Sequence, residues 1–510
     1  MSQLVTSPAY SIDLSFLNRE LKRLTLENEL LREKLRLVLI AKYGPASEKL
    51  NDAQLSLLEG EPGVSREEVL AEAARGALPE APPAVQPQGG GRKHPGRQTF
   101  SADLPRVERV ITLKPEDCCC KACGAETKVI GFDESEQLDA EPARYFVLVT
   151  KREKRVCGHC DNGGVATAAL PPRILDKSLV SDRIIIDTVV AKYSDHLPLY
   201  RQSVILSRET GIGISRATMD GWVMQVGGML LPVVERMRLD LLSGSYIQAD
   251  ETTVDVQVGN GSGSNHQAYL WQYGKPGGET VFDFRMGRGR EGPKKFLAQY
   301  AGILQTDGYT VYDSVGGANM VRAACWAHAR RKFVEALKLN PQDVAAARIA
   351  VSINGLFAVD ALARELSLEQ RHQLRSEKSA PLLASLHEEL KKIQYQVLPA
   401  GALGRAAAYT LTLWPKLIRF LDHPELELSN NFAENSMRGV ALGRKNWIHI
   451  GSENAGPKVA AILSVVESCK RLGVAARSYL AELLPGLKDL KIQEIATRTP
   501  AAWVNSKSKA

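Results

Sequence analysis

The clearest alternation of hydrophobic and polar positions in this chain lies between residues 246 and 258. Val254, Val256 and Val258 alternate with polar neighbours, and β-branched residues dominate this half of the stretch, so the pattern predicts a β-strand. Asp250 has the same parity as the valines, and an undistorted strand would direct its carboxylate to their face. Because a lone buried carboxylate is costly unless it is paired, we expect other acids to share a cation with Asp250.

The pattern after this strand predicts a hairpin turn, two more strands, a helix and a fourth strand, at residues 260–265, 267–273, 279–284, 293–300 and 302–307, and a Gly turn follows the fourth strand. Three strands, a helix and a fourth strand are the element order of a ribonuclease H-like α/β fold. In that fold one acid lies on the first strand and a second lies at the end of the fourth. Asp250 and Asp307 occupy these two places.

A third acid is expected on a later helix, and Glu434 is the candidate. On such a helix Phe432, Met437 and Val440 can face the core. Glu434 precedes Arg438 by four residues, which is also the spacing of an ordinary surface ion pair. Two asparagines before Glu434 and a basic run after it favour a site instead. The long interval from Asp307 to Glu434 includes an Ala/Leu-rich helical insertion at about residues 335–424.

Three carboxylates suit two Mg²⁺ ions, with Mn²⁺ as a substitute, because small hard cations prefer oxygen ligands and keep positions open for phosphate. Such a pair of ions serves in-line displacement at phosphorus. We therefore predict Asp250, Asp307 and Glu434 as catalytic metal ligands.

The N-terminal region has a heptad pattern instead. Residues three and four apart form one apolar stripe with a single polar member, Asn28, at Leu14, Leu17, Leu21, Leu24, Asn28, Leu31, Leu35 and Val38. Asn at an a-type position favours a two-stranded parallel coiled coil, so we predict a homodimer or higher assembly. A surface helix that packs on its own domain is the alternative.

A helical pattern returns from residue 181 to residue 242. Residues 199–209 form one predicted helix, residues 211–214 a turn, and Ser215 is a suitable N-cap for a second helix. The arrangement is similar to a helix-turn-helix, with Arg216 as a candidate DNA contact. A plain helical packing unit has the same pattern, and both interpretations stay open.

Six of the eight cysteines fall between Cys118 and Cys160. Two Cys-x2-Cys pairs are separated by strand-like stretches at 127–130 and 144–150, which predicts a zinc ribbon with four thiolate ligands, Cys120, Cys123, Cys157 and Cys160. Redox-active thiols are the alternative, and Cys118 or Cys119 is able to replace a ligand after a slip in register.

Net charge is +7 and the isoelectric point is about 8.8, which is compatible with a polyanion partner without requiring one. The basic residues are clustered, and the candidate DNA contacts besides Arg216 are Arg92, Lys93, Arg97, Lys151, Arg152, Lys154, Arg155, Arg330, Arg331, Arg438, Arg444 and Lys445. Each cluster by itself is also consistent with a solvated face. His328 is a further candidate for phosphate contact, and a role in the core or on a solvated face stays open for it and for Trp326.

Length bounds the architecture, since 510 residues exceed one ordinary core. No apolar run approaches the roughly 18–20 residues of a membrane span, and residues 1–10 lack the features of a signal peptide. We expect a soluble cytoplasmic, nucleoid-associated protein without a membrane partner. The predicted parts of this multidomain α+β chain are a coiled-coil region (1–77), a flexible basic linker (78–106), the zinc-ribbon module (107–175), the helical module (176–242), the catalytic domain (243–450) and C-terminal helices (451–510).

Together these motifs resemble the insertion-sequence family 66 transposases. The residues that carry the resemblance are Ala249-Asp250-Glu251-Thr252, Thr306-Asp307-Gly308-Tyr309, Cys325-Trp326-Ala327-His328-Ala329-Arg330-Arg331, Asn430-Asn431 through Glu434, Gly443-Arg444-Lys445-Asn446-Trp447, the stretch 192–202 and both cysteine pairs. The resemblance implies a prokaryotic DDE-type transposase that binds the terminal inverted repeats of its element, cuts the 3′ ends and joins them to target DNA. It also implies accessory proteins from the same element.

One departure from the family pattern is Ser429, where the family usually has Asp before the asparagine pair. The resemblance places the metal ligands at Asp250, Asp307 and Glu434, so we expect activity to survive this change. A sequence-specific DNA-binding protein or repressor with an inactive nuclease domain is the alternative function. Both proteins would bind element ends, and only the enzyme would cut them.

Overall fold

The computed structural model describes residues 21, 23–25, 28, 31, 145–156, 165–258 and 265–507. The chain divides into two compact units, one made of Met1–Ser65 and Thr150–Ala510 and the other of Arg66–Val149. The fold described below is that of the first unit. The described residues between 21 and 31 are helical, as the heptad pattern predicts, and pairing with a second copy stays a prediction.

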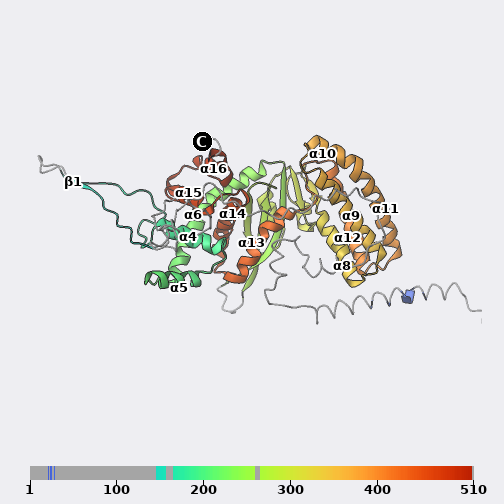
Figure 1. Ribbon diagram of the computed structural model, residues 1–510, viewed down its shortest axis with the longest axis horizontal. Coiled ribbons are helices and arrows are strands. Elements are labelled where there is room, and N and C mark those ends of the chain that lie inside the picture. The colour runs from blue at the N-terminus through green and yellow to red at the C-terminus, as the bar shows by residue number, and fades with distance from the viewer. Residues whose placement is uncertain are drawn as a thin grey trace, which may run out of the picture. The chain divides into compact units, whose positions relative to one another are not determined.

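A mixed six-stranded sheet forms the centre of this unit (Figure 1). Its main path has the order β5-β4-β3-β6-β7, and β8 pairs with β3. The strands are β3 (Tyr246–Val256), β4 (His266–Gly274), β5 (Thr280–Arg285), β6 (Ile303–Thr306), β7 (Val321–Ala324) and β8 (His449–Ile450). Pairing is antiparallel for β3 with β4 and for β4 with β5, and parallel for β3 with β6 and for β6 with β7. A separate two-stranded sheet pairs β1 (Lys154–Val156) with β2 (Val165–Thr167).

Helices before, between and after the strands in sequence build one hydrophobic core with the sheet. They are α4 (Asp182–Tyr193), α5 (Leu199–Thr210), α6 (Arg216–Leu242), α7 (Glu291–Leu297), α13 (Asn431–Trp447), α14 (Gly456–Arg471) and α15 (Ala476–Leu483), with the terminal α16 (Pro500–Lys507). Helix α14 packs on α6 and β5, and α13 packs on β3 and β4.

The insertion forms a second core on the other side of the sheet, which it meets at β6 and β7 (Figure 1). Its helices are α8 (Trp326–Leu339), α9 (Val344–Leu362), α10 (Leu368–Leu374), the π-helical turn η3 (Arg375–Ser379), α11 (Ala380–Gln396) and α12 (Ala402–Leu417), followed by the 3₁₀ turn η4 (Ile418–Leu421). The predicted helical insertion is thus confirmed, and it begins earlier than residue 335 because α8 starts at Trp326. Among the described helices, α9 is long and apolar enough to cross a membrane by length and composition alone. It packs instead against α8 and α11, as a core helix does.

Local sequence explains where the first helices begin and end. The Ser215 hydroxyl accepts a hydrogen bond from the Thr218 N–H at 3.1 Å, so Ser215 is the N-cap that the sequence predicts. Helix α5 stops at Gly211, whose φ of 72° lies in the left-handed region, which glycine adopts without a steric penalty.

The predicted order of three strands, a helix and a fourth strand is confirmed. Two boundaries differ from the prediction. Helix α7 begins at Glu291 rather than 293 and ends at Leu297, because the next residue, Ala298, has a φ of 47°. Residues 145–150 have no regular secondary structure, and strand pairing begins only at Lys154.

The prediction that Phe432 faces the core is wrong, whereas Met437 and Val440 are buried as predicted. Phe432 is 42% exposed. Five residues along a helix correspond to a rotation of about 140°, so Phe432 and Met437 cannot share one face. The guanidinium of Arg471 lies 5.8 Å from the Phe432 ring centroid.

Candidate active site

Strands β3 and β6 place Asp250 and Asp307 by register. Gln248 is the direct register partner of Gln305 in this parallel pair. Each predicted acid follows its glutamine by two residues, and residues two apart on a strand point to the same face. Asp250 and Asp307 therefore emerge side by side where the parallel pairing of β3 with β6 ends.

The turn after β6 fixes the backbone of Asp307. The Asp307 Oδ1 accepts a hydrogen bond from the Tyr309 N–H at 2.8 Å, and the Asp307 carbonyl accepts one from the Tyr409 hydroxyl at 2.6 Å. Gly308 has a φ of 98°, and a Cβ there would lie 2.5 Å from Leu413 Cδ1. Glycine is required here for both conformation and space.

A buried polar network joins the two strands to the start of α13. The Gln248 Nε2 lies 2.9 Å from the Gln305 Oε1 and 2.9 Å from the Ser429 carbonyl. The Tyr246 hydroxyl donates to Gln305 Oε1 at 2.5 Å, and Gln305 Nε2 donates to the Glu427 carbonyl at 2.7 Å. The three side chains of the network, Tyr246, Gln248 and Gln305, are all buried.

The same network reaches the residue next to Glu434. The Ala433 N–H donates to Gln248 Oε1 at 3.3 Å, and the Trp326 N–H donates to the Leu428 carbonyl at 2.8 Å. Residues 427–433 are thereby tied to β3, β6 and the start of α8, and Glu434 is held beside the two aspartates. Ser429 takes part through its backbone carbonyl, so replacement of Asp by Ser leaves this contact intact.

The other acids act electrostatically on Asp250. Burial raises the pKa of Asp250 well above its usual range, and the negative charges of Glu251, Glu434 and Asp307 raise it further. Burial also raises the pKa of Glu434, with an additional contribution from Asp307, while Arg331 and Arg438 oppose that shift. Unlike a paired carboxylate, Asp250 sits among like charges.

Glu251 is a fourth acid at this place, which the sequence analysis did not single out. Its carboxylate accepts hydrogen bonds from Arg288 Nη2 at 2.7 Å and from the Tyr312 hydroxyl at 3.1 Å. Burial raises the pKa of Glu251, and the Arg288 hydrogen bond opposes the shift. Because Arg288 pairs with Glu251, this carboxylate belongs to the site without adding an unpaired charge. In the sequence, its position directly after Asp250 is the feature that could have identified it.

Two residues of α8 face Glu434. Arg331 Nη2 lies 3.5 Å from Glu434 Oε2, and His328 Nδ1 lies 3.6 Å from Glu434 Oε1. Burial and the positive charge of Arg331 lower the pKa of His328 to about 4, so its imidazole is neutral at pH 7. Glu434 thus has partners from α8 in addition to Arg438 at helical spacing, whose charge also acts on it. Trp326 belongs to the core, where its Nε1 donates to the Leu417 carbonyl at 2.9 Å.

The acids fit a hard divalent cation. Glu434 Oε1 is buried and has no hydrogen-bond partner within the described part of the chain, and Asp250 lies among three other carboxylates. Oxygen donors with excess negative charge are the ligand set that Mg²⁺ and Mn²⁺ prefer.

The predicted DNA contacts have different surroundings. Arg216, Lys445 and the four basic residues at positions 151, 152, 154 and 155 are exposed, and Arg155 pairs with Glu153 at 2.8 Å. Arg444 instead donates to Thr252 Oγ1 at 3.0 Å and to the Thr253 carbonyl at 2.6 Å. These contacts give Arg444 a structural role on β3. Arg330 donates to Asn354 Oδ1 at 2.6 Å.

Several predicted site residues lie outside the described residues. They are the basic residues Arg92, Lys93 and Arg97 and the four cysteines Cys120, Cys123, Cys157 and Cys160.

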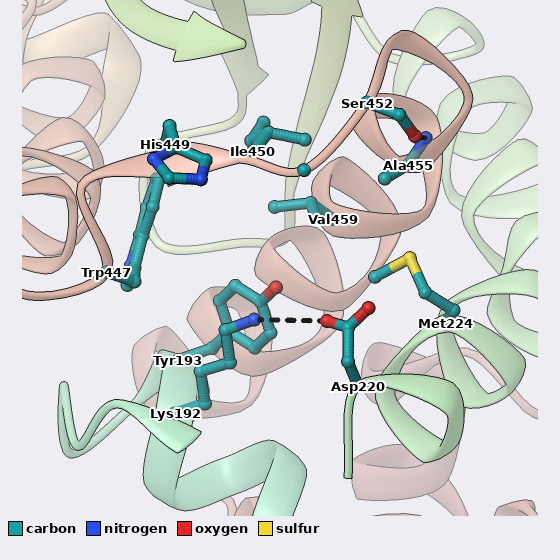
Figure 2. Close-up of a pocket in the computed structure, with 11 residues that line it drawn as sticks. Lys192, Tyr193, Asp220, Met224, Trp447, His449, Ile450, Ser452, Ala455 and Val459 are labelled. Carbon is teal, nitrogen blue, oxygen red and sulfur yellow. Dashed lines mark hydrogen bonds and ion pairs between the residues drawn. The ribbon is translucent and has the colours of Figure 1, made fainter. Parts of the chain in front are cut away.

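A small cavity of about 160 Å³ lies between α4, α6 and the chain after α13 (Figure 2). Lys192 and Asp220 face each other in it, with Nζ and Oδ1 3.9 Å apart, and Trp447 and His449 line the opposite wall. Trp447 is thirteen residues beyond Glu434 on one helix, which is about 20 Å along its axis. This cavity is therefore separate from the acids.

Comparison with known proteins agrees with these motifs. A family model described as "Transposase IS66 family" matches residues 177–458, more than half of the chain. A model described as "zinc-finger binding domain of transposase IS66" matches residues 117–161, which include all four predicted zinc ligands. A third, described as "Transposase C of IS166 homeodomain", matches residues 30–109.

Three similar proteins come from Sinorhizobium fredii (strain NBRC 101917 / NGR234). Uncharacterized protein y4qI is 33% identical over 463 residues, covering 87% of this chain and 83% of the relative. Uncharacterized protein y4jD is 31% identical over 442 residues, covering 82% and 85%, and uncharacterized protein y4hP is 28% identical over 436 residues, covering 81% and 78%. With the family model spanning the sheet, the insertion and all three acids, the chain belongs to the IS66 family of DDE transposases, enzymes of phosphoryl transfer on DNA.

Proposed function

We propose that this transposase binds the terminal inverted repeats of its insertion sequence, cleaves the 3′ ends of the element and transfers them into target DNA. The observation that carries the proposal is the convergence of Asp250, Asp307 and Glu434 at one edge of the sheet, where burial and the negative charges of Glu251, Glu434 and Asp307 raise the pKa of Asp250. The strand order β5-β4-β3-β6-β7 supports a ribonuclease H-like catalytic domain.

Asp250, Asp307 and Glu434 are the residues that would hold divalent metal ions, Mg²⁺ or Mn²⁺. When bound, these ions supply charge stabilisation for phosphoryl transfer and lower the pKa of the attacking hydroxyl group. The network of Tyr246, Gln248 and Gln305 holds the three carboxylates in position before DNA arrives, which reduces the reorganisation needed in the transition state. Arg331, beside Glu434, contributes positive charge next to the acids.

The remaining modules serve DNA recognition and assembly in this proposal. Cys120, Cys123, Cys157 and Cys160 hold a structural zinc ion, and the exposed basic residues between the two cysteine pairs contact phosphate. Arg216 begins a helix after a Gly-containing turn, as the second helix of a helix-turn-helix does. The N-terminal coiled coil joins two or more copies, and the protein acts in the prokaryotic cytoplasm on the nucleoid, with accessory proteins of the same element.

A cleavage assay tests the proposal directly. A labelled duplex that carries an element end is incubated with the protein and Mg²⁺, alongside Asp250→Asn and the control Asp255→Asn, which changes an exposed acid of the same strand. We expect wild type and Asp255→Asn to nick at the 3′ terminus of the end, and Asp250→Asn to bind but not to nick. If all three bind and none cuts, even with accessory proteins, the protein is a DNA-binding protein without nuclease activity.

A further inference from the structure

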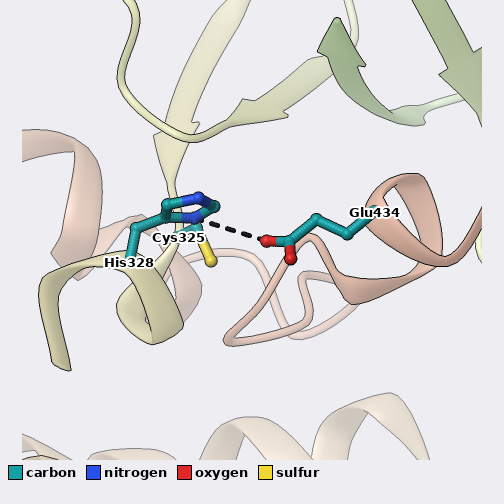
Figure 3. A group of neighbouring side chains, drawn as sticks. All are labelled: Cys325, His328 and Glu434. Atoms are coloured by element: carbon teal, nitrogen blue, oxygen red, sulfur yellow. Dashed lines mark ion pairs between the residues drawn. The ribbon is translucent and has the colours of Figure 1, made fainter. Parts of the chain in front are cut away.

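Cys325, His328 and Glu434 form a cluster at the junction of β7, α8 and α13 (Figure 3). One ligand atom from each residue lies within 4.8 Å of the other two. Cys325 is fully buried directly after β7, His328 lies in the first turn of α8, and Glu434 lies in the first turn of α13. In Figure 3 the imidazole and the carboxylate point toward one another with the thiol next to them.

Unpartnered polar atoms are concentrated around this cluster. Among the described residues, His328 Nδ1 and Glu434 Oε1 are buried and have no hydrogen-bond partner, and so are Oδ1 and Nδ2 of Asn430. Asn430 is adjacent to Cys325, since its N–H lies 3.4 Å from the Cys325 sulfur. Buried polar groups are rarely left without partners. Two such atoms that face each other, with two more on the neighbouring Asn430, therefore indicate a ligand.

The Glu434 side chain is 10% exposed and that of His328 is 18% exposed, so bulk water does not satisfy these atoms. His328 Nδ1 and Glu434 Oε1 are 3.6 Å apart. Bond lengths of 2.0–2.3 Å in a tetrahedral zinc site place neighbouring ligand atoms roughly 3.3–3.6 Å apart. The histidine and the glutamate already have that spacing, and the Cys325 sulfur lies within 4.8 Å of both.

We propose that Cys325, His328 and Glu434 form a binding site for a borderline transition-metal ion of the Zn²⁺ class, distinct from the hard-cation site of the three acids. A thiolate and an imidazole select Zn²⁺ or Co²⁺ over Mg²⁺. Binding replaces the thiol proton of Cys325, which is released to solvent. Because Glu434 belongs to both sites, occupancy by such an ion withdraws this carboxylate from the acids and inhibits DNA cleavage.

Co²⁺ is a suitable probe, since thiolate-bound four-coordinate Co²⁺ has a charge-transfer band in the near ultraviolet and d–d bands in the visible. The full-length chain, with its zinc-finger cysteines saturated by Zn²⁺, is titrated with Co²⁺ as wild type, Cys325→Ser and His328→Ala. The matched control is Cys469→Ser, because Cys469 is the other buried free cysteine in the described part of the chain and lies away from the cluster on α14.

We expect the bands to appear in wild type and in Cys469→Ser. Loss of a ligand should weaken Co²⁺ binding at least about tenfold, since loss of an outer-shell partner already costs 10- to 100-fold. The charge-transfer band should disappear in Cys325→Ser, and His328→Ala tests the site independently if the buried substitution prevents folding. The proposal would be overturned if wild type showed no bands other than those of Co²⁺ exchanged into the zinc-finger sites. It would also be overturned if the bands were unchanged in both Cys325→Ser and His328→Ala. This readout does not require DNA cleavage, so it succeeds or fails independently of the proposed function.

Discussion

Two buried clusters of charged residues lie on either side of the segment that leads into α13, and they differ in how their charges are paired. In the insertion, Arg375 is fully buried and donates to Asp360 Oδ1 at 2.5 Å and to the carbonyls of Phe420 and Leu426 at 3.1 and 2.7 Å. At the sheet edge, Asp250 is surrounded by other carboxylates, and Glu434 has an oxygen without a partner.

The difference between the clusters separates a structural role from a functional one. Arg375 and Asp360 pair with each other and fix the turn at residues 420–426. Neither charge is therefore available to bind a ligand. At the sheet edge, Arg288 and Arg331 compensate Glu251 and Glu434 only in part, and Asp250 lies among like charges, which costs stability and leaves binding capacity for a cation. Burial of charge is common to both clusters, and only the presence of partners distinguishes them.

The largest effect on stability is expected from Arg375→Met. This change leaves Asp360 with only the more distant Arg371, at 3.3 Å, and leaves several carbonyls without donors. Removing one member of a buried pair costs about 3–5 kcal/mol, measurable by chemical denaturation of the full chain. Adding Asp360→Leu should recover part of the loss. A cost below about 1 kcal/mol for the single variant would contradict the structural role of this cluster.

Gln305→Met should affect the acids more than the fold. The substitution keeps side-chain volume but removes the acceptor for Tyr246 and Gln248 and the donor to Glu427, at a cost of about 1–3 kcal/mol. We expect slower end cleavage and a higher Mg²⁺ requirement with unchanged DNA affinity.

The matched control is Gln202→Met. Gln202 is also buried, and its Nε2 donates to the carbonyls of Leu197 at 2.8 Å and Thr188 at 3.2 Å, in a helical part of the chain that carries none of the acids. This variant should lose stability while its Mg²⁺ requirement stays unchanged. An equal shift in both variants would show that the network stabilises the fold without positioning the carboxylates.

Asp250→Asn should stabilise the metal-free protein while it abolishes cleavage. Relief of repulsion is expected to contribute roughly 1 kcal/mol, or about 2–4 °C in the unfolding temperature of a domain of this size. Added Mg²⁺ should reduce the difference by stabilising wild type. A lower unfolding temperature for the metal-free variant would contradict an uncompensated cluster.

The difference in stability between wild type and Asp250→Asn should grow as pH rises. Burial and neighbouring acids raise the pKa of Asp250 in the folded protein, so the proton is held more tightly in the folded state. This contribution to stability is present below the unfolded pKa of about 4 and is lost as pH rises through the folded pKa. In parallel thermal melts of the metal-free proteins, the unfolding temperature of wild type should therefore fall further below that of Asp250→Asn as pH increases from about 4.

The smallest effect is expected from Lys391→Met in the insertion. Lys391 pairs with Glu388 at 3.2 Å, and both side chains are largely exposed. Exposed pairs contribute about 0.2–1 kcal/mol or less, so denaturation should change little. A loss of stability as large as that of Arg375→Met would show that an exposed pair contributes as much as a buried one. Burial would then not account for the contribution of Arg375.

The sequence by itself determined the elements and the two aspartates. Alternation predicted β3 to β6, the Ser215 cap began α6, and Asp250 and Asp307 followed from their places on strands. These features depend on neighbours a few residues apart, which is the range over which periodicity and capping act. The family motifs were likewise visible in the chain and placed Glu434 on its helix.

Only the tertiary structure decided the partners of each charge. The approach of α8 placed Arg331 and His328 at Glu434, and packing tied Arg444 to β3. The insertion buried Arg375, and the register of β3 with β6 joined Gln248 to Gln305. These contacts join positions that are in most cases more than fifty residues apart. They depend on how whole elements pack, which no local pattern of hydrophobic and polar residues specifies.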